Sequence, residues 1–216
     1  SLRENKVMSL KTRFGNLGNI LDFDNLTEEN IYVLDSPILT NSQFKKFKKF
    51  FSKKIKVIDC TFDIQNSLKD RIEAIREEAE TAVREGSTCI VLSDKDFSSQ
   101  KASIPSILTV GAVHSHLVKH GLRGYCSLNV ECSDAMDTHS FAILIGVGAT
   151  TVNPYLAIDS IYQRFEKKLF GKSDFETCIS KFKKSIDAGL LKIMSKMGIS
   201  VISSYRGGCN FEAVGL

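Results

Sequence analysis

The sequence predicts an α/β fold in which strands and helices alternate and the sheet is mostly parallel. Short β-branched or wholly apolar runs recur, and each precedes a longer stretch with apolar residues three and four positions apart. The run at 88–92 is apolar after its first residue, as expected for a strand buried on both faces. Strands that alternate with helices of about 10 to 20 residues pair in parallel through right-handed crossovers.

The first strand–helix pair begins at residues 54–60, a short run rich in β-branched side chains. The helix after it covers about five turns, because its apolar residues recur at spacings of three and four: Leu68, Ile72, Ile75, Ala79, Ala82 and Val83. Gly86 is expected to end this helix, since glycine adopts the left-handed conformation that closes many helices. The strand at 88–92 follows, and Ser93 and Asp94 mark its end.

The next helix and strand follow the same scheme. Pro105 stands where a helix can begin, and apolar residues recur from there to Gly121. A strand is expected at 127–130, and either Asp137 or Thr138 can cap the helix that follows it.

The last part of the chain is predicted to contain three helices and two short strands. Gly146 and Gly148 end the first of these helices, before a strand at 149–152. Two further helical patterns are recognised by their apolar spacing: Ile158-Ile161-Phe165 and Phe175-Ile179-Phe182-Ile186. Gly198 then separates the last helix from a final strand at 199–202.

A single domain, residues 1–216, is expected, because no low-complexity linker divides the chain. Residues 1–50 do not fit the repeat and are expected to form an irregular segment that leads into the fold and packs on its outside. The pattern does not separate an open sheet from a partial or irregular (βα) barrel.

The composition is that of an ordinary globular protein, with 43% hydrophobic and 25% charged residues and a net charge of +4. No apolar run approaches the roughly 18 to 20 residues of a membrane span, and no secretory signal pattern is visible. The cysteines lie in or beside apolar runs without a compact framework, which suits reduced thiols in the cytoplasm: Cys60, Cys89, Cys126, Cys132, Cys178 and Cys209.

A lysine-rich stretch at 44–54 invites a nucleic-acid interpretation. Phenylalanines interleave with these lysines at spacings of three and four, as in an amphipathic helix with a solvated basic face. No base-reading motif accompanies it, so no nucleic-acid partner is expected.

The histidines and cysteines are candidates for metal ligands and for nucleophiles, and their spacing favours neither role. His116 and His120 lie one helical turn apart, as two metal ligands can, whereas His114 points away from His120. No third ligand is close in sequence, so hydrogen-bonding histidines near a helix end are the simpler interpretation. Cys126 and Cys132 lack the CxxC spacing of an iron–sulfur site, and nothing places Cys132 beside His139 as a nucleophile pair. No metal site is predicted.

Two groups of polar residues are candidate functional positions. Asp94, Glu131 and Asn153 follow predicted parallel strands, at the edge where α/β enzymes place their chemistry. Arg206, with Gly207 and Gly208 after it, can contact an anion or a neighbouring domain, because glycines allow close backbone approach. The simpler alternative for Arg206 is a tight turn tied to that neighbour. Gly146-Val-Gly148 lacks the third glycine of a dinucleotide fingerprint and follows a helix.

Several runs together resemble the central domain of the glutamate synthase large subunit. They occur in the family's order over essentially the whole chain: LDSP at 34–37, LSD at 92–94, IPSIL at 104–108, AVH at 112–114, GLR at 121–123, HSFA at 139–142, GATTVNPYLA at 148–157, GLLKIMSKMGIS at 189–200, SYRG at 204–207 and FEAVGL at 211–216. The sequence departs from the family at 208–210, Gly-Cys-Asn, where members commonly have Ala-Gln-Ile, so side-chain contacts there are in doubt.

The resemblance implies a parent enzyme, an oxidoreductase acting on CH–NH2 donors, that makes two L-glutamates from L-glutamine and 2-oxoglutarate. In this family an amidotransferase domain releases ammonia, and an FMN domain with a 3Fe-4S cluster performs the reductive amination. The central domain is similar in topology to the FMN domain, joins the two and helps line the ammonia tunnel. The electron donor is ferredoxin or a nicotinamide-dependent small subunit, which carries FAD and 4Fe-4S clusters. The segment 199–216 would then lead toward the FMN domain.

The chain's own residues suit a non-catalytic connector. The loops at 131–134 and 153–155 occupy the places of the phosphate-binding loops of barrel flavoproteins, but they lack glycine and the first carries two carboxylates. No cofactor is therefore expected in this fragment. The alternatives are a free-standing α/β enzyme using the strand ends, or a partner-binding module using the lysine–phenylalanine helix.

Overall fold

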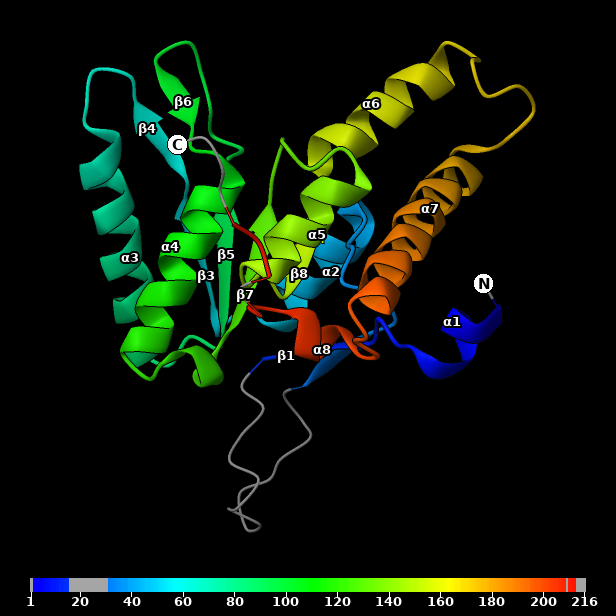
Figure 1. Cartoon of the computed structure of the whole chain (residues 1–216). Helices are drawn as coiled ribbons and strands as arrows, with labels where there is room; N and C mark the ends of the chain where they lie inside the picture. Colours follow the sequence, from blue (N-terminus) through cyan, green and yellow to red (C-terminus); the bar gives the residue numbers. More distant parts are fainter. Residues whose placement is uncertain (1, 16–30, 209, 213–216) are drawn as a thin grey trace.

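The computed structural model describes residues 2–15, 31–208 and 210–212, and its centre is a parallel four-stranded sheet (Figure 1). The strands are β3 (Ile55–Asp59), β5 (Cys89–Ser93), β7 (Ser127–Glu131) and β8 (Thr151–Asn153), in the order β3-β5-β7-β8. All neighbouring pairs are parallel, which confirms the predicted α/β class and the first four strands. Within the described residues this sheet has two edges, so it is open and does not close into a barrel.

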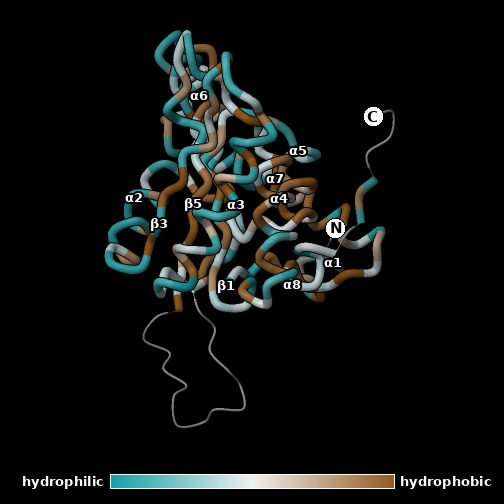
Figure 2. The backbone as a smooth tube through the Cα atoms, turned by 90° about the vertical axis from the view of Figure 1, so that its left-hand side faces the viewer, coloured by the Kyte–Doolittle hydropathy of each residue, from teal (hydrophilic) through white to brown (hydrophobic). Residues whose placement is uncertain are grey.

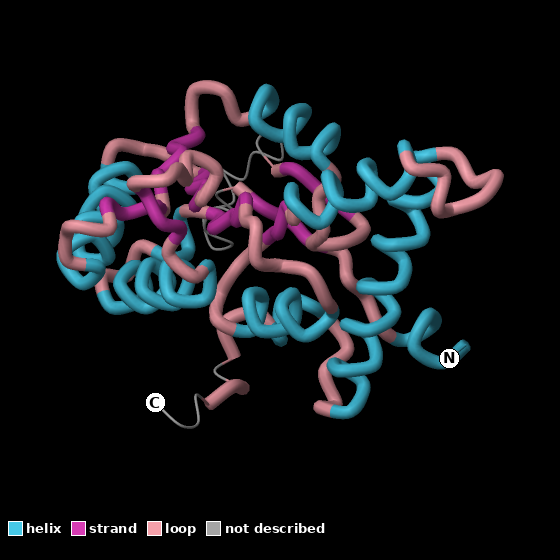
Figure 3. The backbone as a smooth tube through the Cα atoms, turned by 90° about the horizontal axis from the view of Figure 1, so that it is seen from above, coloured by secondary structure: helices cyan, strands magenta, loops and turns pink. Residues whose placement is uncertain are grey.

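Three helices connect successive strands: α3 (Leu68–Arg84), α4 (Ser106–Lys119) and α5 (Thr138–Gly146). The Ser67 and Asp137 side chains cap α3 and α5 by accepting from backbone N–H groups in the first turn. Asp137, one of the two predicted caps, is thus the cap used. Seen from above, these helices lie on one side of the sheet (Figure 3).

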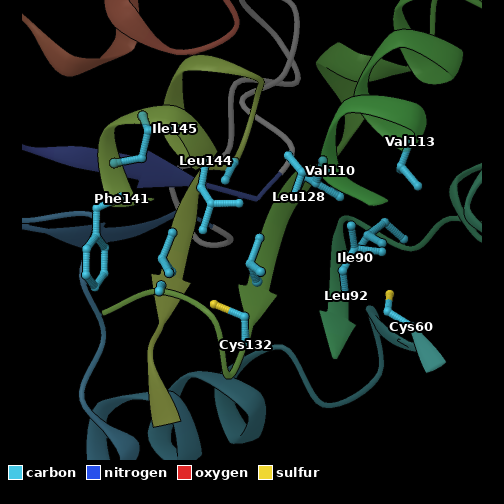
Figure 4. Packing of buried hydrophobic residues seen from close by; sticks show 14 of the residues in the cluster. Cys60, Ile90, Leu92, Val110, Val113, Leu128, Cys132, Phe141, Leu144 and Ile145 are labelled. Atoms are coloured by element: carbon cyan, nitrogen blue, oxygen red, sulfur yellow. The ribbon is translucent and has the colours of Figure 1, made fainter. Parts of the chain in front are cut away.

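The sheet separates two hydrophobic clusters, because successive residues of a strand point to opposite faces. Ile90 and Leu92 of β5 belong to the larger cluster, which also contains residues of α3, α4 and α5. The close view shows them on the side of the sheet that carries Val110 and Val113 of α4 (Figure 4). Cys89 and Val91 face the other way, onto a smaller cluster that contains Phe47. A strand apolar on both faces was predicted from this run, and the two clusters confirm it.

Residues 1–50, expected to be irregular, contain four regular elements in their described part. These are α1 (Leu2–Val7), the antiparallel pair β1 (Thr12–Phe14) and β2 (Tyr32–Leu34), and α2 (Asn41–Phe50). α2 is the predicted amphipathic helix: it buries Phe44 and Phe47 against the sheet, while three of its lysines are exposed: Lys45, Lys46 and Lys49. In Figure 2, α2 is mostly hydrophilic whereas α4 is largely hydrophobic. The polar run at 16–25 lies outside the described residues.

The LDSP run has a structural role at the open edge of β8. Ile38 forms a parallel bridge with Val152, and Val152 donates its N–H to the carbonyl oxygen of Pro37. The Ser36 hydroxyl donates to Asp187 at 2.6 Å, which ties the run to α7 (Phe175–Lys196). This edge is therefore covered by backbone from the N-terminal part of the chain.

Beyond β8 the chain forms α6 (Tyr155–Glu166), α7 and the short helix α8 (Ile202–Tyr205). The final strand predicted at 199–202 is wrong. Only Val201 pairs, in a single parallel bridge with Ser9, and α8 begins at the next residue. A helical turn forms here instead of a strand because it buries both Ile202 and Tyr205, which are three positions apart.

Two short strands were not predicted. β4 (Thr61–Asp63) and β6 (Lys101–Ser103) form an antiparallel pair beyond the ends of β3 and β5. A 3-10 turn, η2 (Arg123–Tyr125), precedes β7. No helix in the described part of the chain is long and apolar enough to cross a membrane.

Candidate functional site

The three predicted strand-end residues lie together at the carboxyl edge of the sheet, and all are buried. Glu131 and Asn153 are direct partners in the β7–β8 register, and Ser93 of β5 is the partner of Glu131 on its other side. The N–H of Asp94 donates to the carbonyl oxygen of Glu131. The structure thus brings the three residues together at one edge.

The Glu131 carboxylate contacts side chains from β5, from the turn after β5 and from α2. Its Oε2 accepts from the Ser93 hydroxyl at 2.9 Å and lies 3.3 Å from Lys48 Nζ of α2. Its Oε1 lies 3.5 Å from Lys95 Nζ. The lysines neutralise a carboxylate that would otherwise be buried without a counter-charge. The lysine partners could not be inferred from sequence, because α2 is distant in the chain.

Asp94 is held by the loop after β7. Its Oδ2 accepts from both the backbone N–H and the hydroxyl of Ser133, at 3.0 and 2.5 Å. Its Oδ1 and the Tyr155 hydroxyl are buried without a hydrogen-bond partner in the structure. Burial, with a further contribution from the Asp94 charge, raises the pKa of Tyr155. Tyr155 is therefore a poor proton donor at neutral pH.

Asn153 fixes the backbone next to the LDSP run. Its Nδ2 donates to the carbonyl oxygen of Leu39 at 2.9 Å and to Asn41 Oδ1 at 3.0 Å. Since it links β8 to the start of α2, its hydrogen bonds stabilise the fold.

The strand-end groups hydrogen-bond to one another and to adjacent backbone. A cavity of about 630 Å³ lies between α6 and α7, with Phe170, Cys178 and Phe182 in its wall. Convergent polar groups around a closed cavity would have favoured a free-standing enzyme. The hydrogen bonds of these polar groups hold the strand ends to the neighbouring loops and to the start of α2.

A second polar site lies at the amino ends of the strands, opposite the carboxyl ends. It was not predicted from the sequence. Arg123 of η2 donates to the carbonyl oxygens of Cys126 at 2.6 Å and Gly148 at 2.8 Å. It also donates to His114 Nδ1 at 3.1 Å and to the Thr150 hydroxyl at 3.3 Å. One guanidinium thus ties together α4 and the segments that lead into β7 and β8. The GLR run contains this arginine, but its partners depend on the folded sheet.

His114 is neutral in this arrangement, because its Nδ1 accepts from Arg123. Burial, and then the Arg123 charge, lower the pKa of His114 to about 4. Its ring packs against Gly148 and Gly207, where an added Cβ would lie 2.4 and 2.8 Å from ring atoms. The two glycines therefore make room for the imidazole.

We expect His114 to cause a loss of stability in acid. An unfolded histidine titrates near pH 6.5, so the folded state binds fewer protons between there and about pH 4. The stabilisation present above pH 6.5 is lost as pH falls through this window. Discounted for partial exposure, the loss is about 1 to 2 kcal/mol. Urea unfolding at pH 7.5 and 5 should show a smaller pH effect in His114→Asn, whose amide oxygen can take the place of Nδ1 as the acceptor for Arg123. An equal pH effect in both proteins would contradict the assignment.

The predicted Arg206 site lies beside this cluster. Burial, followed by the charge of Arg123, lowers the pKa of Arg206 to about 10. Its Nε is buried and has no hydrogen-bond partner among the residues that the structure describes. Gly207 has φ +66° and donates its N–H to the Ile145 carbonyl oxygen, and Gly208 donates to that of Tyr205. Arg206 is a largely buried cation near a second cation.

The histidines separate into two places. His114 faces Arg123, whereas His116 and His120 face Glu80 of α3, with His116 Nε2 2.6 Å from Glu80 Oε2. Sequence reasoning missed Glu80, because it lies 36 positions before His116 and on another helix.

The five described cysteines are free and buried. Cys126 precedes β7 and Cys132 follows it, so the length of a strand separates them. Burial raises the pKa of the Cys60 and Cys89 thiols to about 12. The separation of Cys126 from Cys132 does not suit two ligands of one iron–sulfur cluster.

Comparison with known proteins decides the family. Residues 1–216 match the family described as Glutamate synthase central domain. The chain belongs to that family. This central domain is 52% identical, over all of its length, to the Azospirillum brasilense glutamate synthase [NADPH] large chain. It is 39% identical to the corresponding large chain of Bacillus subtilis and to the ferredoxin-dependent glutamate synthase of Spinacia oleracea. The chain spans 14% of the length of each of these relatives.

Among solved structures, the central domain is similar to a mutant flavocytochrome b2 with benzoylformate. The TM-score is 0.48 and the identity 15%, over 81% of this chain and 41% of that one.

Proposed function

We propose that this chain is the connecting domain of a complete glutamate synthase and is not itself catalytic. The observation that carries this is the full-length match to a segment of much longer glutamate synthases. The parent would convert L-glutamine and 2-oxoglutarate into two L-glutamates with a reduced electron donor. The domain would hold an amidotransferase and an FMN domain of the same polypeptide in register and help line the ammonia path between them.

The polar cluster at the strand ends supports a non-catalytic role. Glu131 is paired with Lys48 and Lys95, and Asn153 is used to hold backbone. Because these groups already bond one another, they are not free to hold a phosphate. We therefore propose that FMN and a 3Fe-4S cluster belong to the neighbouring domain. FAD and 4Fe-4S clusters would belong to a nicotinamide-dependent small subunit where ferredoxin is not the donor.

Exposed apolar side chains support a docked surface. Ile107 and Leu108 at the start of α4, and Met136 just before α5, are 41, 45 and 47% exposed. Clusters of exposed apolar side chains often mark interfaces. The segment after α8 lies along the same helices, because Phe211 approaches Gly146 of α5. We propose that this surface and the segment 199–216 face the FMN domain, in a cytoplasmic enzyme.

Arg206 is the residue through which we propose to test the connector role. In the full-length protein, Arg206→Ala should lower glutamine-dependent glutamate synthesis more than ammonia-dependent synthesis, because a displaced neighbour loses ammonia to solvent. The yield of glutamate per glutamine hydrolysed should fall. The exposed Arg164→Ala is the matched control.

Three outcomes would contradict parts of the proposal. Unchanged ammonia transfer and flavin content in Arg206→Ala would remove the role of this residue. Loss of every activity in a well-folded Asp94→Asn protein would favour catalysis at the strand ends. Saturable, micromolar flavin binding by the isolated chain would overturn the placement of FMN in the neighbour.

A further inference from the structure

A histidine–carboxylate cluster lies where α3 packs on α4, away from the strand ends and from Arg206. Glu80 comes from α3, and His116 and His120 come from the last turn and the C-cap of α4. One ligand atom from each residue can be chosen so that all three lie within 4.8 Å of one another. His116 Nε2 is 2.6 Å and His120 Nδ1 is 3.8 Å from Glu80 Oε2.

The hydrogen bonds around the cluster leave lone pairs for a metal ion on Glu80 Oε2 and His120 Nε2. Glu80 Oε1 accepts from Arg84 at 2.8 Å, which orients the carboxylate and leaves Oε2 toward the histidines. His120 Nδ1 lies 2.8 Å from the carbonyl oxygen of His116 and therefore carries the proton, so its Nε2 holds a lone pair. A histidine whose other ring nitrogen donates to a backbone carbonyl is the usual arrangement in a metal site.

We propose that Glu80, His116 and His120 bind one divalent transition-metal ion of the zinc class. Two imidazole nitrogens and one carboxylate oxygen match the ligand preference of Zn²⁺, and three protein ligands leave a fourth position for water or a neighbour's side chain. The side chains are 21, 11 and 35% exposed, so the ion can enter from solvent without opening the core.

Binding requires only a small rearrangement. Ligand atoms around a tetrahedral zinc ion stand about 3.3 Å apart, given bonds of about 2.0 Å. The Glu80–His116 contact therefore lengthens by a few tenths of an ångström, and the His120 side chain turns to bring its Nε2 toward the ion. The ion takes the place of the proton now shared between Glu80 Oε2 and His116 Nε2. His116 then carries its ring proton on Nδ1, which is buried without a partner in the structure.

The local fold explains why the cluster is preformed. His116 and His120 are four positions apart, so they stack on one face with ring centroids 4.2 Å apart. α3 is fixed beside α4 by buried Ile75 and Ala79, which are five positions and one position before Glu80. Ligands on packed helices lose little conformational entropy when an ion binds. Besides binding the ion, the site would link α3 to α4.

Zinc binding by the full-length protein tests the proposal without measuring turnover, and it is independent of the proposed function. Equilibrium dialysis against Zn²⁺ at pH 7.5, with metal analysis, compares the wild type with His120→Ala and with Glu80→Gln. Each variant should bind one equivalent less, or bind that equivalent at least about 100-fold more weakly, since even outer-shell changes cost 10- to 100-fold. His139→Ala removes an exposed histidine outside the cluster and should bind as the wild type does.

The outcomes separate a metal site from an ordinary hydrogen-bonded pair. Zn²⁺ should also raise the melting temperature of the wild type and of His139→Ala, but not of the variants at Glu80 and His120. If all four proteins bind the same number of equivalents with the same affinity, the cluster is only a contact between helices. His120→Ala is the decisive variant, because His120 is the most exposed of the three and its loss should leave the fold intact.

Discussion

Gly148→Ala should destabilise the domain by about 2 to 5 kcal/mol, the sum of a strained backbone and an overpacked side chain. Gly148 has φ +127°, which L residues rarely adopt, and its added Cβ would lie 2.4 Å from His114 Cγ and 2.8 Å from His114 Cβ. Those atoms are next to the backbone of α4 and cannot swing aside. Urea unfolding of the 216-residue chain measures the loss.

Substitutions at two other glycines separate the effect of backbone strain from that of the overpacked side chain. Gly86→Ala also has positive φ but meets nothing within 4 Å, so it reports backbone strain alone. Gly111→Ala, within α4 and equally open, should stabilise the chain by about 0.5 to 1 kcal/mol. A Gly148→Ala protein as stable as Gly86→Ala would mean that the His114 ring gives way freely.

Arg123→Met should cost about 3 to 5 kcal/mol, because charge-assisted hydrogen bonds are lost and carbonyl oxygens are left without donors. The carbonyl oxygens of Cys126 and Gly148 both accept from this guanidinium. Methionine keeps most of the apolar contact of the arginine stem. The loss would be measured by urea unfolding, with the exposed Arg164→Met as a control expected within about 0.5 kcal/mol of the wild type.

A second readout tests the electrostatic part of this assignment. The Arg123 charge helps to lower the pKa of His114, so that pKa should rise in Arg123→Met. The acid-induced loss of stability should therefore still begin near pH 6.5, where the unfolded histidine titrates, but it should be complete at a higher pH and be smaller in total. A loss of stability below about 1 kcal/mol in Arg123→Met, with an unchanged pH profile, would contradict the role given to Arg123.

The sheet and its crossover helices could be predicted because local signals agreed with the final fold. The run at 88–92 is apolar on both faces and became β5, between two hydrophobic clusters. The run at 199–202 carries the same β-branched signal, but no sheet edge is available to it beyond one pairing with Ser9. β4 and β6 were missed because strands of three residues carry almost no periodicity.

The candidate sites could be predicted only in part. The place of a residue at the end of a strand follows from the order of strands in the sequence, whereas its hydrogen-bond and ion-pair partners depend on how distant elements pack. Asp94, Glu131 and Asn153 reached one edge as expected. Lys48 comes to Glu131 from a helix 83 positions earlier in the chain, and no local pattern announces this pairing. Glu80 and His116 meet through helix packing in the same way, so a metal ligand remained hidden from a search of nearby sequence.

The bridge between Ser9 and Val201 gives the domain a mechanical character. The Ser9 N–H donates to the Ser200 carbonyl oxygen, and the Ile202 N–H donates to that of Ser9. Because the two segments run parallel, tension applied through residues before Ser9 and after Val201 pulls them in opposite directions along their common axis. Both hydrogen bonds then carry the load together, in shear, instead of breaking one after the other. Force would pass between these two segments through this junction, and the parallel sheet and its strand-end cluster would lie off the path of the load.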